Sequence, residues 1–376
     1  MSQGNNIRGL VTGARRIARA FVHELRLHRT RAALPDGRPR VVIFPSRPPW
    51  DPASNLRAYC LLPELAKLGW RALVVPDPLT LRQRLRILRW ERPDVVLMQQ
   101  TRHLLNRPRL YPGMPCVLDA DDADCLDPRH AARIAEAAAD AAAVVGGSRF
   151  VAAWLGRHNP NAHVIWTCTP ARDGQCLVPP TLRRPILAWA HASPLAYPHE
   201  AALVAAVVRK LAAKCAFEFW LFGTTEAEAA TWLSPLRAAG AVCRAIPPLG
   251  YAEYLRVTAG CAVGMQPVCT ENEFSHGKSF GKVLAYLQGQ VAVVATRAVD
   301  HPLFFRDGEN GHLVANDVDE WVRALHRLLT DQAHRERLAL AGARDFAARL
   351  TTGVHARLLD PILRSVMRCP GESGEG

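Results

Sequence analysis

Short, continuously apolar runs alternate with longer stretches of helical periodicity from residue 40 onward. Continuous apolar runs are typical of strands buried on both faces, and apolar residues at three-and-four spacing are typical of amphipathic helices. Their alternation with short loops predicts a parallel sheet covered by helices on both sides. In the first half of the chain the predicted strands are 41–44, 71–75, 93–98, 116–119 and 143–145, and the predicted helices are 56–68, 79–90 and 129–142.

A proline-rich segment, residues 169–185, reads as a linker between two such units. Beyond it the predicted strands are 186–190, 217–222, 242–245, 262–265 and 291–295, and the predicted helices are 200–213, 226–239 and 251–259. The fold class expected is α/β, with two Rossmann-like doubly wound domains facing a central cleft that binds ligands at the carboxyl ends of the strands. The expected division is a leader helix (1–38), an N-terminal domain (39–175), a C-terminal domain (176–350) and a final helix with a tail (351–376).

The leader changes this picture because it is both basic and amphipathic. Residues 1–40 hold nine arginines against two carboxylates, which is +7 of the net charge of +13. A basic amphipathic helix can lie on an anionic membrane surface; the alternative is that its apolar stripe packs on the protein. Because more than half of the excess charge lies in the leader and the other 336 residues carry +6, no nucleic-acid partner is expected. The stripe comprises Ile7, Leu10, Val11, Ala14, Ile17, Ala18, Phe21, Val22 and Leu25.

Length and composition bound the remaining possibilities. The 376 residues, 49% hydrophobic and 22% charged, suit a globular protein of two domains. No apolar run reaches the roughly 18 residues of a membrane span, and no cleavable export signal is evident. Ten cysteines are scattered without a C-x-x-C pair, which argues against a zinc or disulfide framework and for a reducing compartment. The expected location is cytoplasmic, with peripheral contact to the cytoplasmic face of the membrane through the leader.

The stretch from residue 271 to 296 combines an acidic loop, a Gly-Lys-Ser turn, a predicted helix and a buried strand. Ser279 occupies a predicted N-cap position, and a helix start can bind a phosphate. Lys278 and Lys282 are two of only five lysines among 47 basic residues, so a compact, mobile charge is favoured at this point. The alternative is two solvated surface lysines. A P-loop is disfavoured because Asn272 stands where that motif requires glycine.

Three segments resemble one known family in order and spacing. They are G-K-S-F-G-K-V-L-A-Y-L-Q-G-Q-V-A-V-V-A-T, D-G-E-N-G-H-L-V and D-E-W-V-R-A-L-H-R-L-L-T-D, all in the last third of the chain. They resemble the C-terminal domain of family-4-type glycosyltransferases of the GT-B fold, a group that includes enzymes of bacterial polysaccharide synthesis. The resemblance extends over residues 40–366.

The resemblance implies transfer of a sugar from a nucleotide-sugar donor to a glycan or lipid-linked acceptor, with retention and without a cofactor or a tightly held metal. Lys278, Lys282 and the amides near Ser279 would then hold the donor diphosphate, where charge develops on the leaving group. His191 and Ser193, after the first strand of the C-terminal domain, are expected to line the donor pocket.

The chain departs from the family at two acidic positions. Many members carry a glutamate, seven intervening residues and a second glutamate, and Gly277 and Ala285 stand at these places. Glu271 and Glu273 are candidate substitutes, or merely solvated loop carboxylates. A second interpretation is therefore a catalytically degenerate GT-B protein that binds a nucleotide sugar or a partner without transfer.

A second candidate site follows the strand at 116–119, where Asp119, Asp121, Asp122 and Asp124 cluster. Asp121 or Asp122 could act as the base for an acceptor hydroxyl. The alternatives are turn and capping chemistry, or a divalent metal, which is not expected. Arg57 is expected either to face the same cleft or to lie on the surface.

Overall fold

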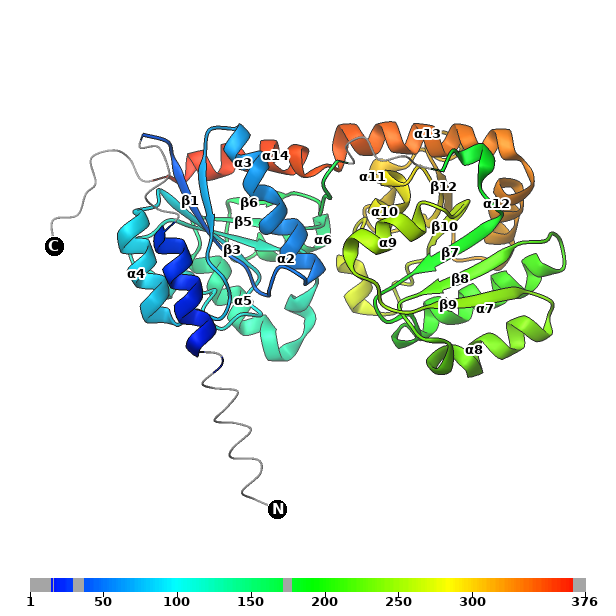
Figure 1. The fold of residues 1–376 in the computed structure, drawn as a ribbon, viewed down its shortest axis with the longest axis horizontal. Helices are drawn as coiled ribbons and strands as arrows, with labels where there is room; N and C mark the ends of the chain where they lie inside the picture. Colours follow the sequence, from blue (N-terminus) through cyan, green and yellow to red (C-terminus); the bar gives the residue numbers. More distant parts are fainter. Residues whose placement is uncertain (1–14, 16, 30–36, 172–177, 368–376) are drawn as a thin grey trace, which may run out of the picture.

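The computed structural model describes residues 15, 17–29, 37–171 and 178–367. It contains two α/β domains, each built on a six-stranded parallel sheet, as the alternation of strands and helices predicts. The strand order is β2-β1-β3-β4-β5-β6 in the N-terminal domain and β12-β11-β10-β7-β8-β9 in the C-terminal domain. Figure 1 shows the two domains side by side. The expected α/β fold class is confirmed.

The N-terminal sheet buries both faces, because alternate residues of its strands point into two separate cores. Val42 and Phe44 pack with helices α4 and α5 on one face, and Val41 and Ile43 pack with α3 and α14 on the other. The strands are β1 (Arg40–Phe44), β2 (Arg71–Val74), β3 (Val95–Gln99), β4 (Cys116–Ala120), β5 (Ala143–Gly146) and β6 (Ala162–Val164). The helices are α2 (Pro52–Arg57), α3 (Leu62–Lys67), α4 (Leu81–Glu91), α5 (Pro128–Asp140) and α6 (Arg149–Leu155).

The single helix predicted for residues 56–68 is wrong. The segment forms α2, a 3₁₀ turn (Tyr59–Leu61) and α3. Pro63 lies in the first turn of α3, and a proline at this place lacks the N–H that would continue a helix from upstream. Helix α2 starts earlier than predicted, with Asp51 accepting a hydrogen bond from the Ser54 N–H at 3.0 Å.

The C-terminal domain repeats the arrangement with two cores, one on each face of its sheet. Its strands are β7 (Ile186–Ala190), β8 (Glu218–Phe222), β9 (Val242–Ile246), β10 (Val263–Gln266), β11 (Ala292–Thr296) and β12 (His312–Val314). Its helices are α7 (Pro198–Ala212), α8 (Glu226–Ala238), α9 (Tyr251–Thr258), α10 (Val283–Gln288), α11 (His301–Phe304), α12 (Val318–Thr330) and α13 (Gln332–Arg349). The turn at 307–311 is present, with Gly308 at a φ of +75°.

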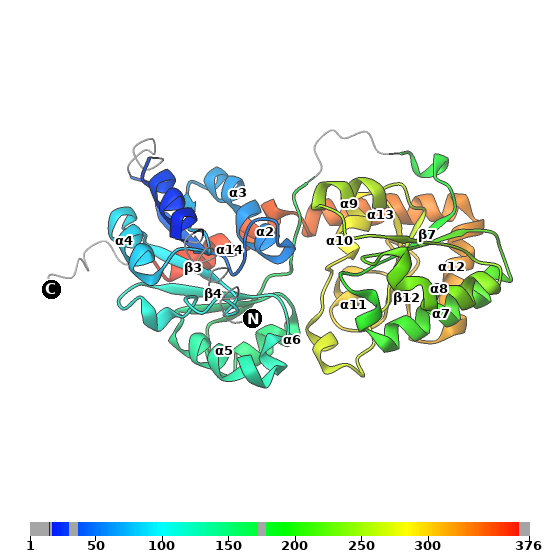
Figure 2. The same cartoon turned by 60° about the horizontal axis from the view of Figure 1, so that its bottom comes forward.

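Helix α14 (Thr352–Ser365) returns the chain to the N-terminal domain. Leu359 and Leu363 are buried in the core that α3 also covers. Figures 1 and 2 show α13 over the C-terminal domain and α14 over the N-terminal one. The domains also touch directly, because the Arg149 Nε and the Trp166 indole N–H donate to Asp300 at 2.9 and 2.8 Å.

The leader is helical over residues 17–29 and packs on α4 by a face that the apolar stripe does not predict. Ala20 is buried, and Glu24 forms an ion pair with Arg86. The stripe residues remain exposed instead: Ile17 at 72% and Phe21 at 63% are the largest examples. The described part of the stripe, from Ile17 to Leu25, therefore does not pack on the protein, and its part in residues 1–14 lies outside the described residues.

No helix of the described residues is long and apolar enough to cross a membrane. The eight cysteines described are all free thiols.

Candidate functional site

A cavity of about 600 Å³ lies between the two domains. Both sheets direct the carboxyl ends of their strands toward it, because Asp121 follows β4, His191 follows β7 and Gly223 follows β8. The N-terminal domain contributes residues 49–56, Asp121, Asp122 and Thr167, and the C-terminal domain contributes residues from the loops after β7, β8, β9 and β10 and from the segment 274–285. The cleft expected from the sequence is therefore present.

Lys278 and Lys282 both line this cleft, but not in the way that the helix prediction implied. Helix α10 begins at Val283 with Lys282 at its N-cap, so the prediction of Ser279 as the N-cap is wrong. A 3₁₀ helix (Glu273–Gly277) precedes the two lysines and takes residues that the sequence placed in a loop. Ser279 lines the cleft, and its carbonyl oxygen lies 3.2 Å from the His301 Nε2.

The two lysines are half-buried cations without a carboxylate partner within ion-pair distance in the described part of the chain. Lys278 Nζ lies 3.6 Å from the centre of the Tyr197 ring, and Lys282 Nζ lies 5.9 Å from that of Tyr254. Burial lowers the pKa of Lys278 to about 8 and also lowers the pKa of Lys282. The aromatic rings thus stabilise both ammonium groups, and the N–H donors of these groups remain available to a ligand.

His191 is next to Lys278, with its Nε2 at 3.3 Å from the Nζ. Burial, reinforced by Lys278 and Lys282, lowers the pKa of His191 to about 3, so the imidazole is neutral. The Ser193 N–H donates to its Nδ1 at 3.1 Å, which places the imidazole proton on Nε2. Two donors therefore lie side by side, an arrangement that an anionic oxygen accepting from both would stabilise.

Glu200 is a site residue that the sequence did not single out. It lies in the first turn of α7, is only 3% exposed and lines the cleft. Its Oε1 accepts hydrogen bonds from the Cys269 N–H at 3.0 Å and from the Ser275 hydroxyl at 3.4 Å. Its Oε2 is buried without a hydrogen-bond partner. A buried carboxylate oxygen in this state is an acceptor available to a ligand hydroxyl.

The aspartates of the acidic cluster have different partners. Asp119 binds the buried Arg57, whose Nε lies 2.9 Å from Oδ2. Arg102 binds Asp122 at 2.7 Å and Asp124 at 2.6 Å. The described residues contain no group of three potential metal ligands.

Among the aspartates of this cluster, Asp121 remains the candidate base for an acceptor hydroxyl. It lines the cleft and accepts a hydrogen bond from the Gln100 amide. Burial and the neighbouring Asp122 raise the pKa of Asp121 to about 7. A carboxyl group with this pKa can take a proton near neutral pH.

Four predicted contact residues lie away from the cleft. Arg57 is completely buried behind it, so neither the predicted cleft position nor the predicted surface position is correct. Glu271 and Glu273 are exposed and do not line the cavity. Ser193 is exposed and acts on the site through its N–H bond to His191.

The structure explains why position 277 holds a glycine. A Cβ at this position would lie 2.5 Å from the Cβ of Ala123 in the other domain, closer than real Cβ atoms approach. A glutamate at position 277 would therefore require the domains to move apart. Ala285 lines the cleft from α10.

Comparison with known protein families gives a match within the C-terminal domain. Residues 194–331 match the family model of glycosyl transferases group 1. A D-inositol 3-phosphate glycosyltransferase of Nocardioides sp. is 36% identical over 136 residues, which are 34% of this chain and 28% of that protein. The corresponding enzyme of Thermobifida fusca is 34% identical over 98 residues, 26% of this chain and 21% of that protein. The matched segment thus spans about a quarter of these relatives.

Solved structures match over both domains. HepE of Anabaena in complex with UDP-glucose has a TM-score of 0.65 at 12% identity, covering 87% of this chain and 99% of that one. Sucrose-phosphate synthase of Thermosynechococcus elongatus has a TM-score of 0.64 at 14% identity with the same coverage. At these identities the likeness establishes the fold. The chain is a two-domain protein of the GT-B glycosyltransferase fold, and its residues 194–331 match the family model of glycosyl transferases group 1.

Proposed function

We propose that the protein transfers a sugar from a nucleotide-sugar donor to an acceptor hydroxyl in the cleft between its domains. The observation that carries the proposal is the set of uncompensated donors at the ends of β7 and α10: Lys278, Lys282 and the neutral His191. A diphosphate supplies the negative oxygens that such a set can bind. UDP and UDP-glucose are the ligands of HepE, so a UDP-sugar is the first donor to test.

Charge at the leaving group is the main chemical problem of this reaction. As the bond between the sugar C1 and the phosphate oxygen breaks, the electron pair goes to the diphosphate. Lys278 and Lys282 stabilise this charge, and fixed positive groups at such a place supply a large part of catalysis. These groups require no metal. The resemblance to family-4-type enzymes favours retention at C1.

The acceptor enters from the N-terminal domain. Its hydroxyl oxygen forms the new bond to C1 on the face from which the diphosphate leaves, so that the configuration is retained, and its proton is taken by the Asp121 carboxylate, which lines the N-terminal side of the cleft. Gln100 orients that carboxylate through its amide hydrogen bond. The acceptor class that we propose is a glycan or a lipid-linked molecule.

Glu200 is proposed to bind a hydroxyl of the donor sugar through its free Oε2. Replacement by glutamine keeps the shape but removes the charge, so we expect Glu200→Gln to lower kcat/KM by about tenfold to a hundredfold, as for hydrogen bonds to charged groups of ~1.5–3 kcal/mol. Initial rates over a range of donor concentrations measure this. An unchanged kcat/KM would show that Glu200 does not bind the donor sugar. Glu253→Gln, on an exposed ion pair of α9, is the control and is expected to change nothing.

The pH dependence follows from two shifted groups. Asp121 becomes a base as the pH rises through about 7, and Lys278 loses its charge as the pH rises through about 8. We therefore expect kcat/KM to rise, reach a narrow maximum between these values and then fall. Lys278→Arg keeps its charge and should remove the fall at high pH, and Asp121→Asn should remove the rise at low pH. A flat profile between pH 6 and 9 in the wild-type protein would contradict both assignments.

A binding protein without transferase activity is the second candidate, because Gly277 and Ala285 replace the glutamates expected from the resemblance. Incubation with UDP-, GDP- and ADP-sugars separates the two. Slow release of free nucleotide, which Lys278→Ala abolishes, supports the enzyme. Tight binding without release, even when acceptor extracts are added, supports the binding protein.

A further inference from the structure

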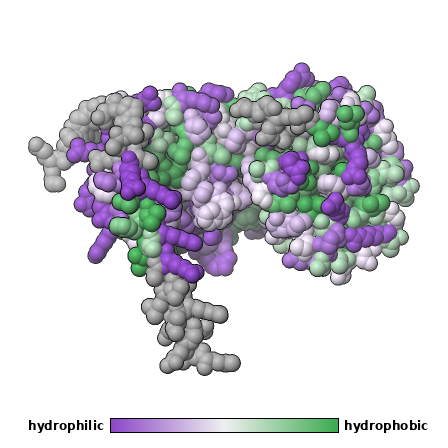
Figure 3. Space-filling model, in the orientation of Figure 1, coloured by the Kyte–Doolittle hydropathy of each residue, from purple (hydrophilic) through white to green (hydrophobic). Residues whose placement is uncertain are grey.

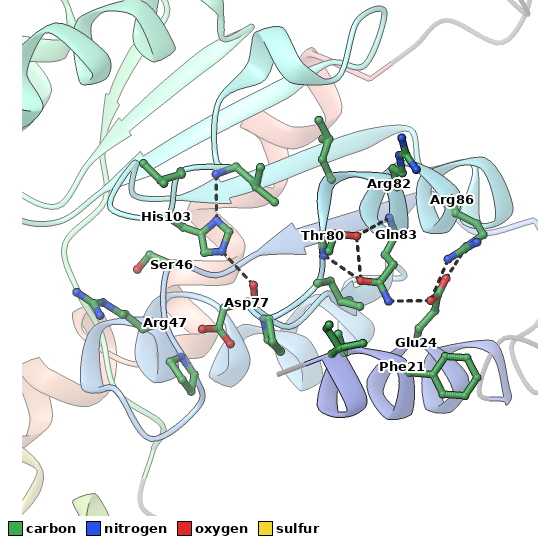
Figure 4. A pocket seen from close by; sticks show the side chains of 18 of the residues that line it. Phe21, Glu24, Ser46, Arg47, Asp77, Thr80, Arg82, Gln83, Arg86 and His103 are labelled. Carbon is green, nitrogen blue, oxygen red and sulfur yellow. Dashed lines mark hydrogen bonds and ion pairs between the residues drawn. The ribbon is translucent and has the colours of Figure 1, made fainter. Parts of the chain in front are cut away.

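A second cavity, of about 1620 Å³, lies on the N-terminal domain between the leader helix and the body. We call it the leader groove. Four segments form its walls: the leader helix (17–28), the loop 46–52, the segment 77–90 with the start of α4, and the loop 102–105. Figure 4 shows Phe21 and Glu24 of the leader on one side and Ser46, Arg47, Asp77 and His103 on the other.

The groove gathers exposed apolar side chains. Fourteen large hydrophobic side chains are exposed in the described residues, and five of them line this one groove. Contiguous exposed apolar surface of this kind marks an interaction site in a folded protein. The five are Ile17 (72% exposed), Phe21 (63%), Leu25 (42%), Trp50 (81%) and Leu104 (68%).

The charge around the groove is positive. Arg47 and Arg82 line it and are exposed, and Arg15, Arg19 and Arg29 are exposed on the leader helix. Three carboxylates also line the groove: Glu24 of the leader helix is neutralised by Arg86 at 2.5 Å, and Asp51 and Asp77 are outnumbered by the arginines. Figure 3 shows apolar residues beside charged ones where the leader meets its domain. An occupant with apolar chains and anionic groups matches both properties.

The groove lies beside the cleft between the domains. Trp50 and Pro52 line both cavities, so the loop that joins β1 to α2 separates them by a single wall. A molecule held in the groove therefore lies next to the side of the cleft where Asp121 stands.

We propose that the leader groove docks on an anionic bilayer and takes up a hydrocarbon chain of a membrane lipid. The exposed Ile17, Phe21 and Leu25 of the leader enter the apolar layer with Leu104, and the arginines contact the lipid phosphates. This inference rests on the proposed function in one respect: it places the open cleft at the membrane surface, where a lipid-linked acceptor can reach Asp121.

Vesicle flotation with the full chain tests the proposal. Vesicles of phosphatidylcholine alone are compared with vesicles containing about one-third phosphatidylglycerol, and we expect binding only to the second kind. The double variant Phe21→Ser with Leu104→Ser should weaken that binding by about tenfold or more, since each side chain loses its apolar burial. Arg47→Glu with Arg82→Glu should weaken it as well. Leu182→Ser, at an apolar residue 73% exposed on the other domain, and Arg323→Glu are the matched controls.

Insertion into the groove has a separate readout. Phosphatidylglycerol with bromine at mid-chain should quench tryptophan fluorescence, and replacing both tryptophans that line the groove, Trp50→Phe with Trp90→Phe, should remove most of the quenching. Equal flotation of all variants, equal binding to uncharged vesicles or quenching that this double variant leaves intact would overturn the proposal. Self-association of the wild-type chain that Phe21→Ser with Leu104→Ser abolishes would assign the groove to a second copy and also overturn it.

Donor hydrolysis, which needs no membrane, distinguishes a failure of the membrane proposal from a failure of the proposed transferase function. Hydrolysis at the wild-type rate by the Phe21 and Leu104 double variant is the expected result. Hydrolysis combined with equal flotation of all variants sinks only the membrane inference. Vesicle binding as expected, with no hydrolysis of any nucleotide sugar, sinks only the transferase.

Discussion

Replacing Lys278 with methionine is expected to lower the rate of sugar transfer or donor hydrolysis by about 10²–10³-fold, the typical cost of removing one charge-stabilising donor. Methionine keeps the unbranched stem and much of its packing on Tyr197 but cannot bind the diphosphate. Because the charge is needed most as the leaving group departs, the loss should appear in kcat as well as in donor affinity. Release of nucleotide at saturating donor measures it.

The control for this prediction is Lys210→Met. Lys210 is an exposed lysine of α7 that pairs with Asp319, outside the cleft. Its replacement is expected to leave the rate within about twofold, because a surface pair contributes ~1 kcal/mol or less, and only to stability. Equal rates for Lys278→Met and Lys210→Met would show that the diphosphate is bound elsewhere.

Replacing Arg57 with methionine is expected to cost about 3–5 kcal/mol of the free energy of unfolding, as for other broken buried ion pairs. Arg57 is fully buried, and its guanidinium donates to Asp119, to the Ile165 carbonyl at 3.0 Å and to the Thr167 hydroxyl at 3.1 Å. Without the arginine, the Asp119 carboxylate remains as an uncompensated charge in the core. Urea unfolding followed by circular dichroism measures the loss.

Arg129→Met is the matched control for Arg57. Arg129 also pairs with an aspartate, Asp127, but its side chain is 84% exposed, so the expected cost is under about 1 kcal/mol. If Arg57→Met instead leaves the urea midpoint unchanged and abolishes acceptor use, the residue belongs to the substrate site after all. That outcome would restore the interpretation that the buried position of Arg57 rejects.

The strands were predictable because a parallel sheet buried on both faces leaves an unmistakable pattern. The run 116–119, for example, becomes β4 within one residue. Helix ends were less predictable. The helix predicted for 79–90 begins at Leu81 with Thr80 as its cap, and Ser279 looks like a cap and is not one, because the chain stays non-helical until Val283.

The face by which the leader helix packs could not be read from its periodicity. The apolar stripe suggests a core-facing side, but the contact to α4 runs through Ala20 and the ion pair of Glu24. Periodicity identifies an amphipathic helix; it does not reveal whether the apolar face meets protein or lipid.

The site was partly predictable for a similar reason. Lys278 and Lys282 stand out because lysine is rare in this chain and because their surroundings resemble a known family. Glu200 and Tyr197 give no such signal, since each lies more than seventy residues from Lys278 and approaches it only in the folded domain, where the Lys278 ammonium lies over the Tyr197 ring and Glu200 accepts from the Cys269 N–H. Contacts of this kind depend on tertiary structure, which local patterns do not encode.

The central claim is that Lys278 and Lys282 hold the diphosphate of a nucleotide sugar. The most direct measurement is a crystal structure of the protein with UDP, or with the nucleotide whose sugar it hydrolyses fastest. We expect phosphate oxygens within hydrogen-bond distance of Lys278 Nζ and His191 Nε2, with Lys282 facing the same group. A diphosphate bound away from both lysines would contradict this claim.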